Sequence, residues 1–149
     1  MKRELSCYCG FYCENCAVMA KVTPAARTLY NEMSAAGFKE VMPLLPGGKD
    51  FWSILYGFAI NDACISCRAD SGDPNCRIRA CAKEKGHEMC AFCESYPCEL
   101  FDKLLSEYPI LIVDNDLLRE KGWLHWLLLQ SKRRAVGFVI QDTKARPET

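Results

Sequence analysis

The sequence predicts one small, mainly α-helical domain with irregular cysteine-rich loops and little β structure. Its 149 residues suffice to bury a single core, and 50% of them are hydrophobic while 26% are charged, a balance typical of globular proteins. Eleven cysteines fall in two blocks, and the cysteine-free stretches between and after them carry apolar residues at helical spacing. We therefore expect a single cysteine-rich, metal-binding domain over residues 1–142 and a flexible tail over residues 143–149.

The first cysteine-free stretch predicts two helices. Thr23 and Pro24 form a helix-start signal and Gly37 is a stop signal, which together predict a helix over residues 24–36. A second apolar run, residues 51–60, follows several prolines and glycines and suits either a short buried helix or a strand. We favour the helix.

Two shorter helices are expected around the second cysteine block. A polar helix begins near Arg77 and ends at Gly86, whose glycine favours the left-handed turn that closes helices. Pro97 is expected to open a further helix with an apolar face. That face comprises Leu100, Phe101, Leu104, Leu105 and Tyr108.

The longest predicted helix runs from an Asn115 cap to about Arg134, after a short β-prone run at residues 110–113. Its core-facing side is expected to comprise Leu117, Leu118, Leu124 and Leu128. Trp123, Trp126 and Leu127 widen the apolar arc of the helix beyond the single stripe that packing on a core needs. We therefore hypothesise that the helix over residues 115–134 docks a protein partner, the alternative being a helix that is simply deeply buried.

Charge and the start of the chain constrain partners and location. Nineteen Lys and Arg balance nineteen Asp and Glu, which leaves no excess positive charge for nucleic acid or an anionic membrane surface. Residues 1–7 contain no apolar signal segment, so we expect a cytoplasmic protein, in which clustered cysteines bind metal rather than form disulfides. The alternative is a secreted domain that is cross-linked by disulfides, and the odd number of cysteines argues against it.

Ten cysteines are candidate metal ligands: Cys9, Cys13, Cys16, Cys64, Cys67, Cys76, Cys81, Cys90, Cys93 and Cys98. They include three CxxC pairs, and two intervening residues allow a tight turn to direct both sulfurs to one ion. We expect two zinc ions. The first would use Cys64, Cys67, Cys90 and Cys93, and the second would use Cys9, Cys13 and Cys16 with one of Cys76, Cys81 or Cys98. The roles of Cys7 and of His87, three residues before Cys90, stay open.

Four cations lie beside the second cysteine block: Arg77, Arg79, Lys83 and Lys85. A zinc ion with four thiolates carries a net charge of about −2. We expect these cations to neutralise thiolates and to donate hydrogen bonds to sulfur.

Three other chemistries use similar cysteine patterns. Four thiolates also hold a [4Fe–4S] cluster, but the ferredoxin run Cys-x2-Cys-x2-Cys-x3-Cys-Pro is absent, so zinc is preferred. Cys9, Cys13 and Cys16 match the spacing of radical S-adenosylmethionine enzymes, whose barrel this short, strand-poor chain does not supply. A thiol oxidoreductase is a further alternative. No catalytic constellation stands out, so the leading hypothesis is an accessory or interaction protein rather than an enzyme.

Three cysteine-bearing segments stand out as longer motifs: residues 8–16 (YCGFYCENC), 76–86 (CRIRACAKEKG) and 90–98 (CAFCESYPC). These motifs resemble the signatures of domain-of-unknown-function family 3795. The resemblance implies a small cysteine-rich protein of the kind found in anaerobic bacteria and archaea, whose cysteines are presumed to bind metal. It implies no catalytic residues.

Overall fold

The computed structural model describes residues 2–60, 64 and 66–144. These residues form six α-helices with short 3-10 and π turns between them, and they contain no β-strand, only one isolated antiparallel bridge. The predicted mainly α class is therefore confirmed. Within the described part of the chain, no helix is long and apolar enough to cross a membrane.

Contacts divide the chain into two compact units. We call Met1–Cys16 together with Ser66–Thr149 the cysteine-rich unit, and Ala17–Ile65 the hairpin unit. The prediction of one domain over residues 1–142 stays a prediction. Of the predicted tail, residue 143 belongs to the 3-10 turn Ile140–Thr143, and residues 145–149 lie outside the described residues.

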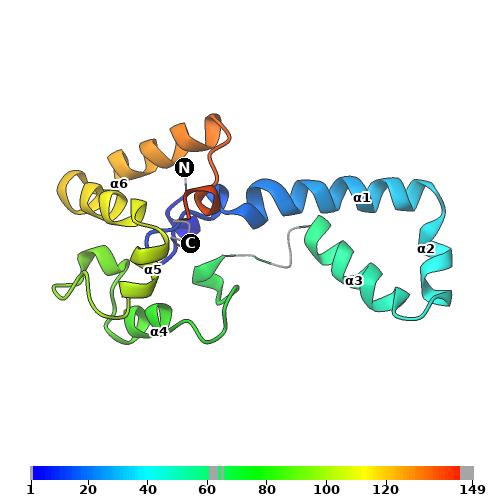
Figure 1. The fold of residues 1–149 in the computed structure, drawn as a ribbon, viewed down its shortest axis with the longest axis horizontal. Coiled ribbons are helices and arrows are strands. Elements are labelled where there is room, and N and C mark those ends of the chain that lie inside the picture. Colours follow the sequence, from blue (N-terminus) through cyan, green and yellow to red (C-terminus); the bar gives the residue numbers. More distant parts are fainter. Residues whose placement is uncertain (1, 61–63, 65, 145–149) are drawn as a thin grey trace, which may run out of the picture. The chain divides into compact units, whose positions relative to one another are not determined.

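The hairpin unit consists of α1 (Thr23–Ala35), α2 (Phe38–Val41) and α3 (Gly48–Ala59), with α1 and α3 packed against each other (Figure 1). The rings of Tyr30 and Trp52 lie 5.0 Å apart between their centroids and join the two helices.

Both helices predicted in this unit are confirmed. Gly37, at a φ of +79°, follows the end of α1 as expected. Thr23 does not cap α1, because the helical backbone continues into it from the π turn Val18–Val22.

The cysteine-rich unit contains α4 (Arg77–Glu84) and α5 (Asp102–Glu107). The first matches the predicted polar helix, and Gly86 follows its end at a φ of +67°. The second begins later than predicted. Pro97 does not open it, because the chain first makes a turn in which the Phe101 N–H donates to the Cys98 carbonyl at 2.7 Å.

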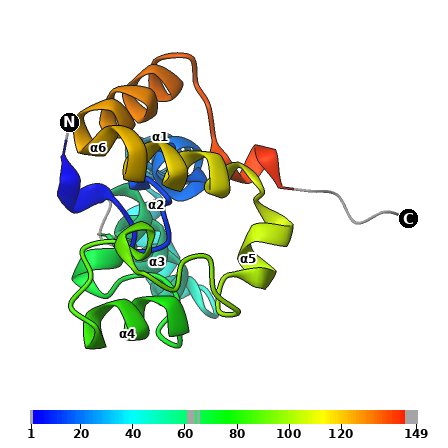
Figure 2. The same ribbon diagram turned by 90° about the vertical axis from the view of Figure 1, so that its left-hand side faces the viewer.

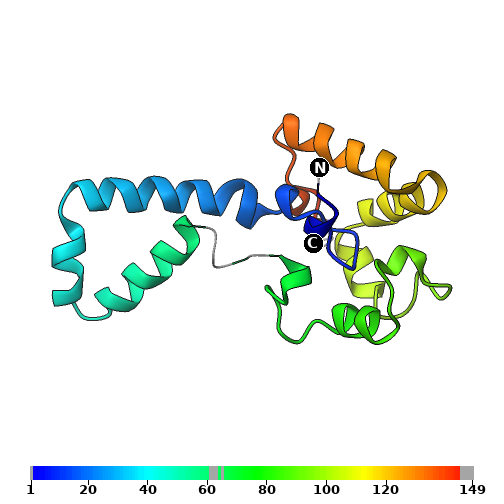
Figure 3. The same cartoon turned by 180° about the vertical axis from the view of Figure 1, so that it is seen from behind.

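The third helix of this unit is α6 (Ile110–Ala135), which corrects two predictions. Residues 110–113 are helical rather than extended: the Leu111 N–H donates to the Tyr108 carbonyl at 3.0 Å, and tertiary packing with Tyr108 and Ile140 overrides the β propensity of the run. Asn115 lies inside the helix, fully buried, instead of capping it. Figures 2 and 3 show the N-terminal loop lying between α6 and α4.

Gly122 interrupts α6 with a backbone at φ +75° and ψ −178°, which no helical residue adopts. This break changes which side chains face the core after it. Leu124 is 63% exposed and Leu128 is also exposed, although both were predicted to be buried, whereas Trp126 is fully buried. The prediction was wrong because it assumed one continuous helical phase.

The apolar arc proposed for docking is largely used within the unit itself. Trp126 and Leu127 are buried beside Tyr12 and Leu118, and Trp123 is half-buried against them. Binding of a partner by residues 115–134 stays a prediction.

Candidate metal centre

The N-terminal loop turns back on itself at Gly10. An antiparallel bridge joins Ser6 to Tyr12, and inside it the Cys7 N–H donates to the Phe11 carbonyl at 2.7 Å. Gly10 closes the turn by donating its N–H to the Cys7 carbonyl at 3.1 Å, with a φ of +104° that L side chains rarely adopt. The turn is therefore built around a glycine between two cysteine-bearing arms.

Three thiols gather around Cys7, and we call the four together the N-terminal thiol cluster: Cys7, Cys9, Cys13 and Cys67. The Sγ atoms of Cys7 and Cys13 lie 3.9 Å apart. Two sulfurs bound at about 2.3 Å to one tetrahedral zinc ion are about 3.8 Å from each other. The observed spacing therefore matches two ligands of a single ion.

Hydrogen bonding between these thiols separates their pKa values. Contacts with the thiols of Cys13, then Cys67 and Cys9, raise the pKa of Cys7 well above its usual range. The Cys7 thiol in turn lowers the pKa of Cys13 to about 7 and the pKa of Cys67 to about 6. One retained proton thus stabilises neighbouring thiolates, which are the form that binds metal.

A buried arginine supports the negative charge of the cluster. Arg79, only 7% exposed, contacts Cys67 and further lowers the pKa of that thiol. Its guanidinium also donates to the carbonyls of Ser71 at 2.8 Å and Asp73 at 2.5 Å, which hold it in place. Arg79 is thus a cation of this segment that contacts a cysteine sulfur, and its neutralising role at a metal site stays a prediction.

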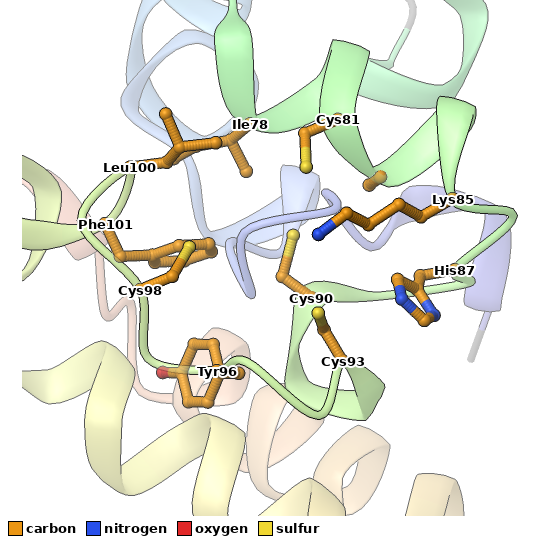
Figure 4. A pocket seen from close by; sticks show the side chains of 11 residues that line it. Ile78, Cys81, Lys85, His87, Cys90, Cys93, Tyr96, Cys98, Leu100 and Phe101 are labelled. Atoms are coloured by element: carbon orange, nitrogen blue, oxygen red, sulfur yellow. The ribbon is translucent and has the colours of Figure 1, made fainter.

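A second group of four cysteines lines one pocket beside α4 (Figure 4). We call Cys81, Cys90, Cys93 and Cys98 the α4 pocket cluster. Burial raises the pKa of Cys90 to about 12, and the nearby thiols add to this shift. His87 also lines the pocket, whereas His125 is exposed and its ring contacts the Lys121 carbonyl.

Contacts in the cysteine-rich unit place Cys67 in the N-terminal thiol cluster, whereas Cys90 and Cys93 line the α4 pocket. The predicted sharing of one ion by these three cysteines and Cys64 stays a prediction. Of the second predicted set, Cys9 and Cys13 do come together around Cys7.

Cys16 and Cys76 have other neighbours. The Sγ of Cys16 accepts a hydrogen bond from Gln141 Nε2 at 3.3 Å, and the Sγ of Cys76 accepts from the Arg79 N–H at the start of α4 at 3.5 Å. Whether the ten predicted cysteines bind metal stays a prediction.

Cys7 is the residue that sequence reasoning left out. It belongs to no CxxC pair, and its contact with Cys13 depends on the loop that turns at Gly10. The signal that could have identified it is the tight succession Cys7-x-Cys9-Gly10, because a glycine directly after closely spaced cysteines indicates a turn that can present both sulfurs.

In residues 2–60, 64 and 66–144, no group of three or more Cys, His, Asp or Glu side chains has the arrangement of a metal site. A zinc ion bound at either cluster would hold its sulfurs about 3.8 Å from one another. Rotation about the Cα–Cβ bond moves a sulfur between staggered positions without displacing the backbone.

Comparison with known proteins gives one finding. The model of a family described as proteins of unknown function, DUF3795, matches residues 5–103, which is more than half of the chain. No curated protein and no solved structure matches the chain. The matched segment contains every cysteine of both clusters, and the chain belongs to the DUF3795 family.

Proposed function

We propose that this protein is a zinc-binding accessory protein whose N-terminal thiol cluster holds one zinc ion. The observation that carries the proposal is the gathering of three thiols around Cys7, with the Cys7 and Cys13 sulfurs at the separation of two ligands on one ion. The lowered pKa values of Cys13 and Cys67 favour the thiolate form near neutral pH, and Arg79 offsets part of the added negative charge.

The proposed role of the ion is structural. Four thiolates complete a tetrahedral shell and leave no open position for substrate or water, unlike catalytic zinc sites. The ion would join the N-terminal loop to the segment that carries Cys67. Arg68 already links these segments by donating to the Ser6 carbonyl and hydroxyl, each at 3.0 Å. Metal binding would add folding free energy to this junction.

The distance between sulfurs also favours zinc over an iron–sulfur cluster at this cluster of thiols. A [4Fe–4S] cluster places its four cysteines on four different iron atoms, so their sulfurs stand further apart than two ligands of one ion. The Cys7 and Cys13 sulfurs, at 3.9 Å, are close enough to share a single ion.

Metal analysis of anaerobically purified protein tests the proposal. We expect zinc by elemental analysis and no visible absorption, and we expect the Cys7→Ser/Cys67→Ser variant to lose one zinc ion per chain. Cys76→Ser is the matched control, because serine preserves the cap of α4 and leaves the cluster intact. Broad absorption near about 400 nm with about four irons per chain would favour the iron–sulfur alternative. A folded double variant with an unchanged zinc content would overturn the proposal.

A thiol oxidoreductase is the second candidate, favoured by the low pKa of Cys67, about 6, beside the Cys7 thiol. In metal-free protein, glutathione disulfide would accept two electrons as two neighbouring thiols of the cluster form a disulfide. A zinc-loaded sample that resists this oxidation supports the structural role, because coordinated thiolates are poor nucleophiles. Rapid oxidation despite bound zinc would favour the redox role.

A further inference from the structure

The turn that carries Cys90 and Cys93 is preorganised. Residues Cys90–Phe92 form a 3-10 turn in which the Cys93 N–H donates to the Cys90 carbonyl at 2.9 Å. The Cys90 N–H is itself bonded to the Tyr8 carbonyl at 2.9 Å, which fixes the start of the turn. A tight turn between two cysteines is the local structure that directs both sulfurs to one ion.

The other two thiols of the pocket come from separate elements. Cys81 lies on α4, and Cys98 precedes α5, so the four thiols enter the pocket from three segments (Figure 4). Apolar side chains, among them Ala82 and Phe101, fill the wall between them. The free space is about 20 Å³, which is room for about one water molecule. Space of that size suits a single ion rather than an organic ligand.

From this arrangement we infer that the α4 pocket cluster is a second zinc site, independent of the N-terminal thiol cluster. Its ligands are Cys81, Cys90, Cys93 and Cys98. All four are free thiols, and Cys90 is buried at 8% exposure. The inference goes beyond the proposed function, which requires only the first ion.

Lys85 supplies charge for the second site. A zinc ion with four thiolates has a net charge of about −2, which needs compensation in apolar surroundings. Lys85 lines the pocket, and Figure 4 shows its ammonium group directed into the space among the sulfurs. Lys83 lies two residues earlier, on α4, and its Nζ instead pairs with Asp70 Oδ1 at 2.5 Å. Lys85 is therefore assigned as a positioning residue that stabilises the thiolate shell.

The number of ions in matched variants tests the second site separately from the first. We expect two zinc ions in the unaltered chain, one in Cys90→Ser/Cys93→Ser, one in Cys7→Ser/Cys67→Ser, and two in Cys76→Ser. Cobalt(II) titration of each variant gives a second readout, because tetrahedral sulfur ligation produces intense visible absorption. Loss of zinc from Cys7→Ser/Cys67→Ser alone would overturn the second site and leave the proposed function standing. Loss of zinc from Cys90→Ser/Cys93→Ser alone would overturn the proposed function and leave the second site standing.

A protection experiment on the unaltered chain covers the case in which a variant does not fold. Zinc should block alkylation of Cys81, Cys90, Cys93 and Cys98, and a chelator should restore it. Alkylation of these four cysteines at equal rates with and without zinc would overturn the inference.

The role of Lys85 is tested in the Cys7→Ser/Cys67→Ser background, which retains only the second site. Lys85→Met should weaken zinc affinity by about 10- to 100-fold in competition with a chelator, the range found for residues that support metal ligands. Lys83→Met is the control and should leave the affinity unchanged. Equal affinities in the two variants would overturn the assignment of Lys85.

Discussion

Gly10 supports the N-terminal thiol cluster through both its backbone and its lack of a side chain. Replacing Gly10 by Ala places a residue with a Cβ at a φ of +104°, and holding a non-glycine residue in such a region costs about 1–3 kcal/mol. The new Cβ would also lie 2.3 Å from Asn115 Oδ1, so the buried asparagine must move.

The displaced asparagine makes two hydrogen bonds that the substitution would disrupt. Asn115 Nδ2 donates to the Cys9 carbonyl at 3.1 Å and to Tyr96 Oη at 2.9 Å. At about 0.5–1.5 kcal/mol for each bond, their loss adds about 1–3 kcal/mol to the backbone cost. Gly10→Ala should therefore reduce the free energy of unfolding by about 2–6 kcal/mol.

Urea denaturation at fixed free zinc and in reductant measures this effect. Gly137→Ala is the matched control, because Gly137 has a φ of +73° and nothing within 4 Å of an added Cβ. Gly137→Ala should show the backbone cost alone. Its loss in the free energy of unfolding should therefore be about 1–3 kcal/mol smaller than that of Gly10→Ala. Asn115→Ala should cost less in the Gly10→Ala background than in the unaltered chain, since the asparagine hydrogen bonds are already disrupted there. Equal losses in the two glycine variants would refute the reasoning.

Three further predictions concern the core, a buried ion pair and thiol reactivity. Trp126→Ala should lower the free energy of unfolding by about 3–5 kcal/mol, because the indole is fully buried, and urea denaturation measures the loss. Arg133→Met should cost about 3–5 kcal/mol in the same assay, because it leaves the fully buried carboxylate of Asp114 without its guanidinium partner. In metal-free protein near neutral pH, iodoacetamide should label Cys67, with a pKa of about 6, well before Cys90, with a pKa of about 12, as followed by peptide mass spectrometry.

Each of the two stability predictions has a control variant. Leu124→Ala removes a side chain that is 63% exposed and should change stability by about 0.5 kcal/mol or less. Arg134→Met removes the pair between an exposed guanidinium and the half-buried Glu14 and should cost at most about 1 kcal/mol. Controls as damaging as Trp126→Ala or Arg133→Met would contradict the assigned packing, and labelling of Cys90 before Cys67 would contradict the assigned pKa order.

The helical class and the C-terminal ends of α1 and α4 follow from the sequence alone. The signals at Gly37 and Gly86 act within one turn of the backbone, so they specify α1 and α4 regardless of what packs against them. The same local logic predicts Arg79 as a cation beside sulfur, since it follows Cys76 in the same short polar segment.

The grouping of the cysteines and the buried face of α6 depend instead on tertiary contacts. Cys67 meets Cys7 because the loop at Gly10 folds back and Arg68 binds the Ser6 backbone, which are contacts between segments distant in sequence. The backbone at Gly122 likewise resets the helical phase through one residue whose conformation the apolar pattern does not encode. CxxC spacing sets the distance between two sulfurs in one turn, whereas the choice of the other two ligands depends on long-range packing, which periodicity and spacing do not contain.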